Sequence, residues 1–228
     1  MFKMFIVSSL VSYCGFACLN YIFTHFLLYN KQTSWYLLHV VCNIIIIIMT
    51  FNDVIYSFTD MNKAFDKTLF DSRPSGITVG LHVFHVINDY KNLTIIDWLH
   101  HLISNWFMAF VGVYYNNYPI WNSGIFFMCG LPGGIDYLLL FLVKRGKIKK
   151  ITEKNINVYL NNWIRNPCII YTCSLNHSAY IQNIIYTPSY IYYISQFFIL
   201  FNAIYFAQRV TLNYGSYKSY KSYREISD

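Results

Sequence analysis

The chain has 228 residues, of which 56% are hydrophobic and only 12% are charged, and its formal net charge is +7. Soluble globular domains carry about 25% charged residues, so this composition excludes an ordinary soluble domain. Several apolar runs approach the roughly 20 residues that are needed to cross a bilayer. We therefore expect an all-α, multi-pass transmembrane bundle of about six to seven membrane segments.

The apolar segments follow one another along almost the whole chain. The segments expected to be membrane helices are residues 2–29, 36–57, 77–89, 96–115, 120–143, 168–186 and 190–208. The run Gly130-Leu131-Pro132-Gly133 should interrupt the fifth of them, because proline removes a backbone donor. In terms of domains, we expect a first membrane helix and loop over 1–35, a membrane domain over 36–208, and a disordered basic Ser/Tyr-rich tail over 209–228.

Positive charge is concentrated in residues 144–165 and in the tail. Lys and Arg beside apolar spans are typical of cytoplasmic loops that face anionic lipid. We interpret 144–165 as such a loop with an amphipathic surface helix, and we expect a cytoplasmic C-terminus. This distribution favours a membrane surface over nucleic acid as the partner of the basic residues.

The candidate chemistry lies in residues 81–101, LHVFHVINDYKNLTIIDWLHH. His82, His85 and Asp89 stand at i, i+3 and i+7, which places them on one side of a helix. After a polar break, the next segment brings Asp97 and the pair His100-His101. Charged groups at the bilayer centre cost ~2.5–3.5 kcal/mol, so a polar cluster inside apolar helices is a functional-site hypothesis.

Three chemistries fit such a cluster. The first is acid–base or nucleophilic catalysis, in which an imidazole takes a proton and a carboxylate orients it. The second is a metal site, since imidazole suits Zn and Fe. The third is hydrogen bonding between helices, worth ~1 kcal/mol or less per pair. The isolated His25, His39 and His177 are interpreted as packed, hydrogen-bonded side chains.

The stretch FHVINDYKNLTIIDWLHH resembles the TLC-domain family of multi-spanning lipid proteins, which includes the ceramide synthases. In that family a His-His pair begins a membrane helix after an upstream aspartate, and acidic residues follow on the next helix. Here the pair is His100-His101, the upstream residue is Asp97 or Asp89, and the later acid is Asp136. The span pattern covers about residues 36–208, and the specific motifs cover 82–137.

Two features depart from the ceramide-synthase pattern. The two-aspartate motif of the later helix is reduced to Asp136, and LISNWFMAF replaces the polar motif that follows His-His. Fatty-acid elongases carry H-x-x-H-H, whereas this chain has aspartate at the first of those positions. The resemblance therefore implies a TLC-like lipid protein of an endomembrane such as the endoplasmic reticulum, with acyl transfer from acyl-CoA to a lipid amine or hydroxyl as the candidate reaction.

The candidate residues have separate roles in that reaction. The expected catalytic residues are His100 and His101 as base or transient acyl carrier, with Asp97 and Asp136 orienting them. The expected substrate-binding residues are His82, His85, Asp89, Lys147 and Lys149, the two lysines holding CoA phosphates. No metal and no tightly bound cofactor are expected. The expected partners are membrane lipids and acyl-CoA as co-substrate. Whether the chain also associates with a second copy of itself stays open.

Two other functions stay open alongside acyl transfer. The chain could be a non-catalytic lipid-binding protein or a regulator of membrane composition, in which the same cavity only binds. It could also be a fatty-acid-elongase-like or metal-dependent membrane enzyme.

Overall fold

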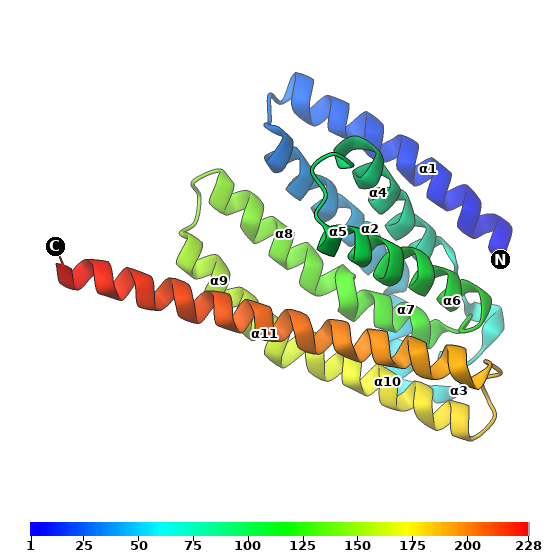
Figure 1. Cartoon of the computed structure of the whole chain (residues 1–228). Coiled ribbons are helices and arrows are strands. Elements are labelled where there is room, and N and C mark those ends of the chain that lie inside the picture. The colour runs from blue at the N-terminus through cyan, green and yellow to red at the C-terminus, as the bar shows by residue number, and fades with distance from the viewer. Residues whose placement is uncertain (228) are drawn as a thin grey trace.

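The chain folds into antiparallel helices joined by short connections (Figure 1). The structure, a computed structural model, describes the backbone of residues 1–227 and the side chains of residues 1–103 and 106–220. The elements are α1 (Phe2–Tyr21), η1 (Ile22–Phe26), α2 (Lys31–Thr59), α3 (Met61–Ala64), η2 (Lys67–Leu69), α4 (Arg73–Asp89), α5 (Ile95–Leu99), η3 (His100–Phe107), α6 (Met108–Tyr114), α7 (Pro119–Ile125), η4 (Phe126–Gly130), α8 (Leu131–Lys144), α9 (Lys150–Tyr159), η5 (Leu160–Arg165), α10 (Asn166–Ile181) and α11 (Ser189–Ser227).

Several of these elements are parts of one continuous helix. The segments η1, η3, η4 and η5 are π-helical turns inside longer helices, and η2 is a short 3₁₀ turn. The described chain thus forms seven long helical segments: α1–η1, α2, α4, α5–η3–α6, α7–η4–α8, α9–η5–α10 and α11. The all-helical fold expected from the composition is therefore found throughout the described residues.

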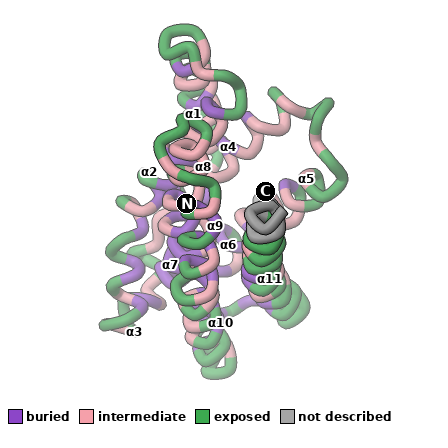
Figure 2. Tube along the Cα trace, turned by 90° about the vertical axis from the view of Figure 1, so that its left-hand side faces the viewer, coloured by how far each residue is buried: buried purple, intermediate pink, exposed green. Residues whose placement is uncertain are grey.

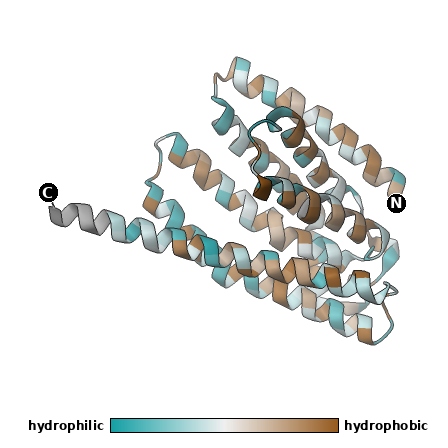
Figure 3. Cartoon of the chain, in the orientation of Figure 1, coloured by the Kyte–Doolittle hydropathy of each residue, from teal (hydrophilic) through white to brown (hydrophobic). Residues whose placement is uncertain are grey.

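Four of the described helices are long and apolar enough to cross a membrane. They cover Phe2–Phe26, Lys31–Thr59, Pro119–Lys144 and Ser189–Tyr220. Figure 3 shows the apolar residues along these helices and more hydrophilic residues near the connections and toward the C-terminal end of α11. A multi-pass membrane protein is the architecture that these helices indicate.

Local sequence signals explain where the helices begin. The side chain of Asn30 accepts a hydrogen bond from the backbone of Thr33 at the start of α2. Proline stands in the first turn of α4 and α7, where its missing N–H has no helical partner to lose. Pro132 and Pro167 instead follow the π-turns η4 and η5 inside longer helices, where a proline interrupts the regular hydrogen bonds. The expected interruption of the fifth segment is present, because the π-turn η4 ends at Gly130 and Pro132 opens α8.

The first helix packs on the outside of the bundle, against α4. Gly76 and Gly80 make this possible, because a Cβ atom on Gly80 would lie 2.6 Å from the backbone oxygen of Ser9. Within α1 itself only Phe16 is buried. Figure 2 shows α1 at the edge of the molecule, while the buried residues gather toward the middle of the bundle. Thus one face of α4 holds α1, and the other face is free to carry the histidines.

Buried hydrogen bonds link the C-terminal part of α2 to α7. Asn122 donates from Nδ2 to Oδ2 of Asp53 at 2.9 Å, and the Ser123 hydroxyl donates to the backbone oxygen of Asp53 at 2.7 Å. Each of these side chains is buried. Hydrogen bonds between polar groups in an apolar core favour one helix register, because a shifted register would break them.

The basic stretch 144–165 holds a short loop followed by a helix, as expected, since residues 145–149 connect α8 to a helix that runs from Lys150 to Ile181. This helix does not lie at a surface throughout, because Glu153, Lys154 and Asn157 are buried. The tail that was expected to be disordered is helical instead, since α11 continues to Ser227. Contacts with α9 support this extension: Lys154 Nζ donates to Asn213 Oδ1 at 2.8 Å and lies 5.7 Å from the ring centroid of Tyr217.

Candidate functional site

A cavity of about 260 Å³ lies in the middle of the bundle. Residues of α2, α4 and all the later long segments line it, and α1 contributes none of its described lining. Most of its lining surface is apolar, although polar side chains from several helices also reach it. The histidine, carboxyl, arginine and amide side chains that line it are His39, Asn43, His82, His100, Asp136, Asn157, Asn161, Arg165, Asn176, Gln196 and Asn202. This mixture is typical of a ligand site, in which apolar walls hold the ligand and a few polar groups orient it.

The four histidines of residues 81–101 converge, as their spacing predicts. The ring centroid of His101 lies 5.1 Å from that of His82, 5.0 Å from that of His85 and 5.6 Å from that of His100. The His82 and His100 rings are 5.8 Å apart. Of the four, His82 and His100 line the cavity, whereas His85 and His101 stand behind them in the same cluster.

A fifth histidine, His39 of α2, joins this cluster. Its ring centroid lies 6.2 Å from that of His82, and its ring stacks on Tyr137 at 3.9 Å. The ring also contacts Trp35, whose indole lies 3.8 Å from both His39 and His85. Its nitrogen Nδ1 is 3.0 Å from the backbone oxygen of Trp35. His39 is thus packed and hydrogen-bonded, as expected, but it also belongs to the cavity wall, which its isolated position in the sequence does not reveal.

Three imidazole nitrogens in the cluster are buried without a hydrogen-bond partner among the described residues. They are the Nδ1 atoms of His82, His85 and His101. A neutral imidazole has one donor and one acceptor nitrogen, and each normally finds a partner when buried. Each of these nitrogens can therefore still accept or donate one hydrogen bond.

The carboxylates expected to orient the histidines have different partners. Asp97 closes a capping box at the start of α5, where Thr94 donates to Asp97 Oδ2 from its backbone at 2.9 Å and from its hydroxyl at 2.8 Å. Asp89 pairs with Lys31, with Oδ1 and Nζ 2.7 Å apart, and its Oδ2 is 4.0 Å from His85 Nε2. Neither aspartate lines the cavity, whereas Asp136 does.

Asp136 belongs to a series of hydrogen-bonded polar side chains along the cavity lining, which we call the polar chain. Asn157 donates from Nδ2 to Asp136 Oδ1 at 2.5 Å, and Asn161 donates from Nδ2 to Asn157 Oδ1 at 2.9 Å. Arg165 then donates to Asn161 Oδ1 at 3.5 Å and to Asn202 Oδ1 of α11 at 2.6 Å. Asn157, Asn161 and Arg165 stand at i, i+4 and i+8, so they form one stripe along the helix.

Arg165 is the main site residue that the sequence interpretation misses. It is 7% exposed, and its Nε donates to the backbone oxygen of Met128 at 3.0 Å. Phe206 links it to the histidines: the guanidinium carbon lies 5.3 Å from the Phe206 ring centroid, and the His100 ring centroid lies 6.3 Å from it. The i, i+4, i+8 stripe is a signal that could have indicated this face, had the segment not been assigned to the membrane surface.

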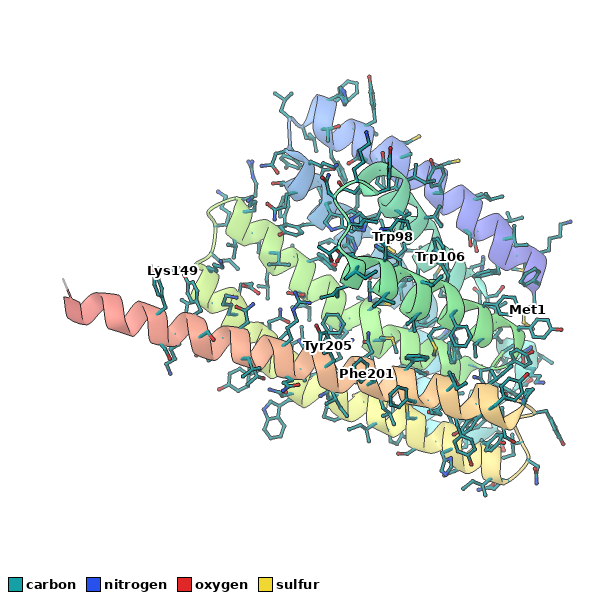
Figure 4. All side chains as sticks on the ribbon, in the orientation of Figure 1. Met1, Trp98, Trp106, Lys149, Phe201 and Tyr205 are labelled. Atoms are coloured by element: carbon teal, nitrogen blue, oxygen red, sulfur yellow. The ribbon has the colours of Figure 1, made fainter. Side chains whose placement is uncertain are left out.

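The two lysines expected to hold CoA phosphates lie away from the cavity. Lys147 and Lys149 are exposed in the connection between α8 and α9, and neither contributes to the cavity lining. Figure 4 shows Lys149 at this connection, at the end of the bundle and away from Phe201 and Tyr205 on α11. Their role in binding remains a prediction.

Three of the π-turns coincide with the site. The turn η3 begins at His100, η4 carries Met128 and Cys129, and η5 ends at Arg165; all of these residues line the cavity. A π-turn inserts one extra residue into a helix and redirects the side chains around it, and such turns are frequent at functional sites. Within the described residues, no group of three or more His, Cys, Asp or Glu side chains is arranged to hold a metal ion.

Comparison of the chain with protein families, with characterised proteins and with solved structures found no match. The functional argument therefore rests on the cavity and its residues.

Proposed function

We propose that the chain is a membrane protein of seven crossing segments that binds a lipid in its central cavity and transfers an acyl group from acyl-CoA to a lipid amine or hydroxyl. The observation that carries the proposal is that His82, His100 and Asp136, from three different segments, line one cavity inside a bundle of apolar helices. The TLC-like His-His pair adds support for lipids as the substrate class and for an endomembrane, such as the endoplasmic reticulum, as the location.

The histidine cluster provides the base for this reaction. A neutral imidazole of His100 or His101 takes the proton of the acceptor amine or hydroxyl as that atom attacks the thioester carbonyl. The new C–N or C–O bond forms, the C–S bond breaks, and the imidazolium returns the proton to the CoA thiolate. General-base catalysis of this kind contributes ~10²–10⁴-fold in rate. Asp136 is the carboxylate in the same cavity that stabilises the transient positive charge.

The test uses purified protein in detergent with a panel of acyl-CoAs and long-chain amine or hydroxyl acceptors, and mass spectrometry detects the products. His100→Ala and His101→Ala should each lower turnover at least ~10²-fold, because each removes an imidazole from the cluster. His25→Ala is the matched control, since His25 is exposed and stacks on Tyr21 outside the cavity. Full turnover in both cluster variants would remove the histidines from the mechanism.

A second function, non-catalytic lipid binding in the regulation of membrane composition, is favoured by one observation. Asp97 is engaged in its capping box, and Lys147 and Lys149 lie outside the cavity lining. One expected catalytic residue, Asp97, and two expected substrate-binding residues therefore do not line the cavity. Under this function the wild-type protein binds lipid in the same assay, but no acylated product forms with any acyl-CoA.

A further inference from the structure

The guanidinium of Arg165 is a buried positive charge at the cavity. It donates to three neutral acceptors, namely the backbone oxygen of Met128 and the side-chain oxygens of Asn161 and Asn202. A guanidinium has five N–H donors, so two remain for other partners. Arg165 also lines the cavity directly.

Among the described residues, no carboxylate forms an ion pair with this guanidinium. The ion pairs of the described chain lie elsewhere, at Lys31–Asp89, Lys63–Asp60, Arg73–Asp71 and His85–Asp89. The polar chain connects Asp136 to Arg165 only through Asn157 and Asn161. Buried charges in proteins are normally paired, because an unpaired ion is poorly solvated in an apolar interior.

We propose that Arg165 binds the anionic group, a carboxylate or a phosphate, of a single-chain amphiphile whose chain occupies the apolar part of the cavity. The ligand thus supplies an anionic group in direct contact with the guanidinium, whereas Asp136 acts on it only from a distance. Arginine suits this role because its planar donors match the oxygens of carboxylate and phosphate in pairs. The inference deepens the proposed function, on which it rests, by naming the headgroup of the lipid.

The position of Arg165 also determines which atoms of the ligand meet the histidines. The guanidinium and the His100 imidazole both contact the ring of Phe206, at 5.3 Å and 6.3 Å from its centroid. An anionic group on Arg165 therefore places the neighbouring atoms of the headgroup, rather than the end of the chain, near the imidazoles. A hydroxyl or amine a few bonds from the anionic group is the acceptor that this geometry fits.

The test measures displacement of a fluorescent fatty alcohol, a neutral probe, from the full chain in nanodiscs of phosphatidylcholine. The competitors share one oleoyl chain: lysophosphatidic acid, oleate, methyl oleate and monoolein. The two anions should displace the probe at about tenfold lower concentration than the two neutral lipids, as expected for a charge-assisted hydrogen bond. Inorganic phosphate alone should not displace it, and displacement by phosphate would overturn the assignment of an amphiphile.

Amino-acid substitutions test whether the preference for anionic lipids depends on Arg165. Arg165→Gln should reduce the preference for anions to less than about twofold, and Arg165→Lys should restore part of it. Lys91→Gln, which removes an exposed cation outside the cavity lining, should leave the preference unchanged. Equal displacement by oleate and methyl oleate in the wild-type protein would overturn the proposal, and this comparison decides the question even if Arg165→Gln does not fold. Retention of the preference in folded Arg165→Gln would overturn it as well.

The same assays separate this inference from the proposed function. Anion binding that depends on Arg165, without any acylated product, would support the headgroup assignment and reject acyl transfer. Acyl transfer to a neutral acceptor at full rate in Arg165→Gln would reject the headgroup assignment and support acyl transfer.

Discussion

The carboxylate of Asp97 stabilises the start of the helix that carries the histidine pair. It closes the capping box with Thr94, which satisfies backbone groups that a helix start otherwise leaves unpaired. Asp97→Ala should therefore lower the free energy of unfolding by ~1 kcal/mol, the usual effect of losing a capping interaction. The measurement is unfolding of purified protein in detergent, followed by circular dichroism.

The matched control for Asp97 is Asp97→Glu, because glutamate at this position also closes a capping box. It should retain most of the stability that Asp97→Ala loses. Acyl-transfer activity per folded molecule should be similar in both variants. A large loss of activity in Asp97→Glu, without a loss of stability, would instead give this carboxylate the orienting role that the sequence suggests.

At the residue scale, the sequence predicts local relations better than distant ones. The spacing of His82, His85, His100 and His101 within twenty residues predicts their convergence, and the ring distances confirm it. His39 lies more than forty residues from His82, so no spacing rule connects them. The sequence does not predict the role of Arg165 for another reason. A charge next to a basic run is typical of a membrane surface, whereas the side chain of Arg165 is buried.

At the scale of elements, the contact between α1 and α4 depends on glycine. A Cβ atom on Gly80 would lie 2.7 Å from Ser12 Cβ and 3.0 Å from the Tyr13 backbone nitrogen. Gly80→Ala should therefore separate the two helices and lower the free energy of unfolding by ~1–3 kcal/mol, as overpacking does. Thermal unfolding in detergent measures this change.

Gly15→Ala provides the comparison for Gly80→Ala, because a Cβ atom at Gly15 meets nothing within 4 Å. In the middle of α1 alanine is a better helix former than glycine. The free energy of unfolding of this variant should therefore equal that of the wild type or exceed it by up to ~1 kcal/mol. A destabilised Gly15→Ala would show that α1 has a second packed face.

The positions of most helices follow from the apolar pattern, but two element boundaries do not. Residues 150–165 mix seven apolar residues with basic and amide side chains, so the sequence pattern assigns them to a basic loop with an amphipathic surface helix. In the bundle their polar side chains face the cavity and α11, where asparagine and lysine find partners. The tail also has partners in the bundle as far as Tyr217, because Lys150 and Lys154 of α9 both lie over the ring of that residue.

At the scale of the whole molecule, charge is unequal between the two ends of the bundle. The connections 27–30, 90–94 and 145–149 and the C-terminus lie at one end, and 60–72, 115–118, 182–188 and the N-terminus lie at the other (Figure 1). In residues 60–73 three basic side chains are balanced by Asp60, Asp66 and Asp71. The first end carries the basic run from Lys144 to Lys150, so we predict that this end is cytoplasmic.

Labelling in sealed microsomes checks this orientation. With a membrane-impermeant maleimide, Lys147→Cys should react in intact vesicles, whereas Asp66→Cys should react only after permeabilisation; the unsubstituted chain controls for the native cysteines. The sequon Asn92-Leu93-Thr94 should carry no glycan, since it lies at the same end as Lys147. The reverse labelling pattern, or a glycan at Asn92, would invert the assignment.

The length of α11 has a mechanical consequence. Its 39 residues extend about 58 Å at 1.5 Å per residue, whereas a bilayer with its headgroups is about 40–45 Å thick. The last turns therefore extend beyond the bilayer, as the continuation of a helix whose middle carries Asn202 and Phe206 in the cavity wall. A force applied to that extension acts as on a lever with its fulcrum in the membrane, and it tilts the wall of the cavity around whatever ligand the cavity holds.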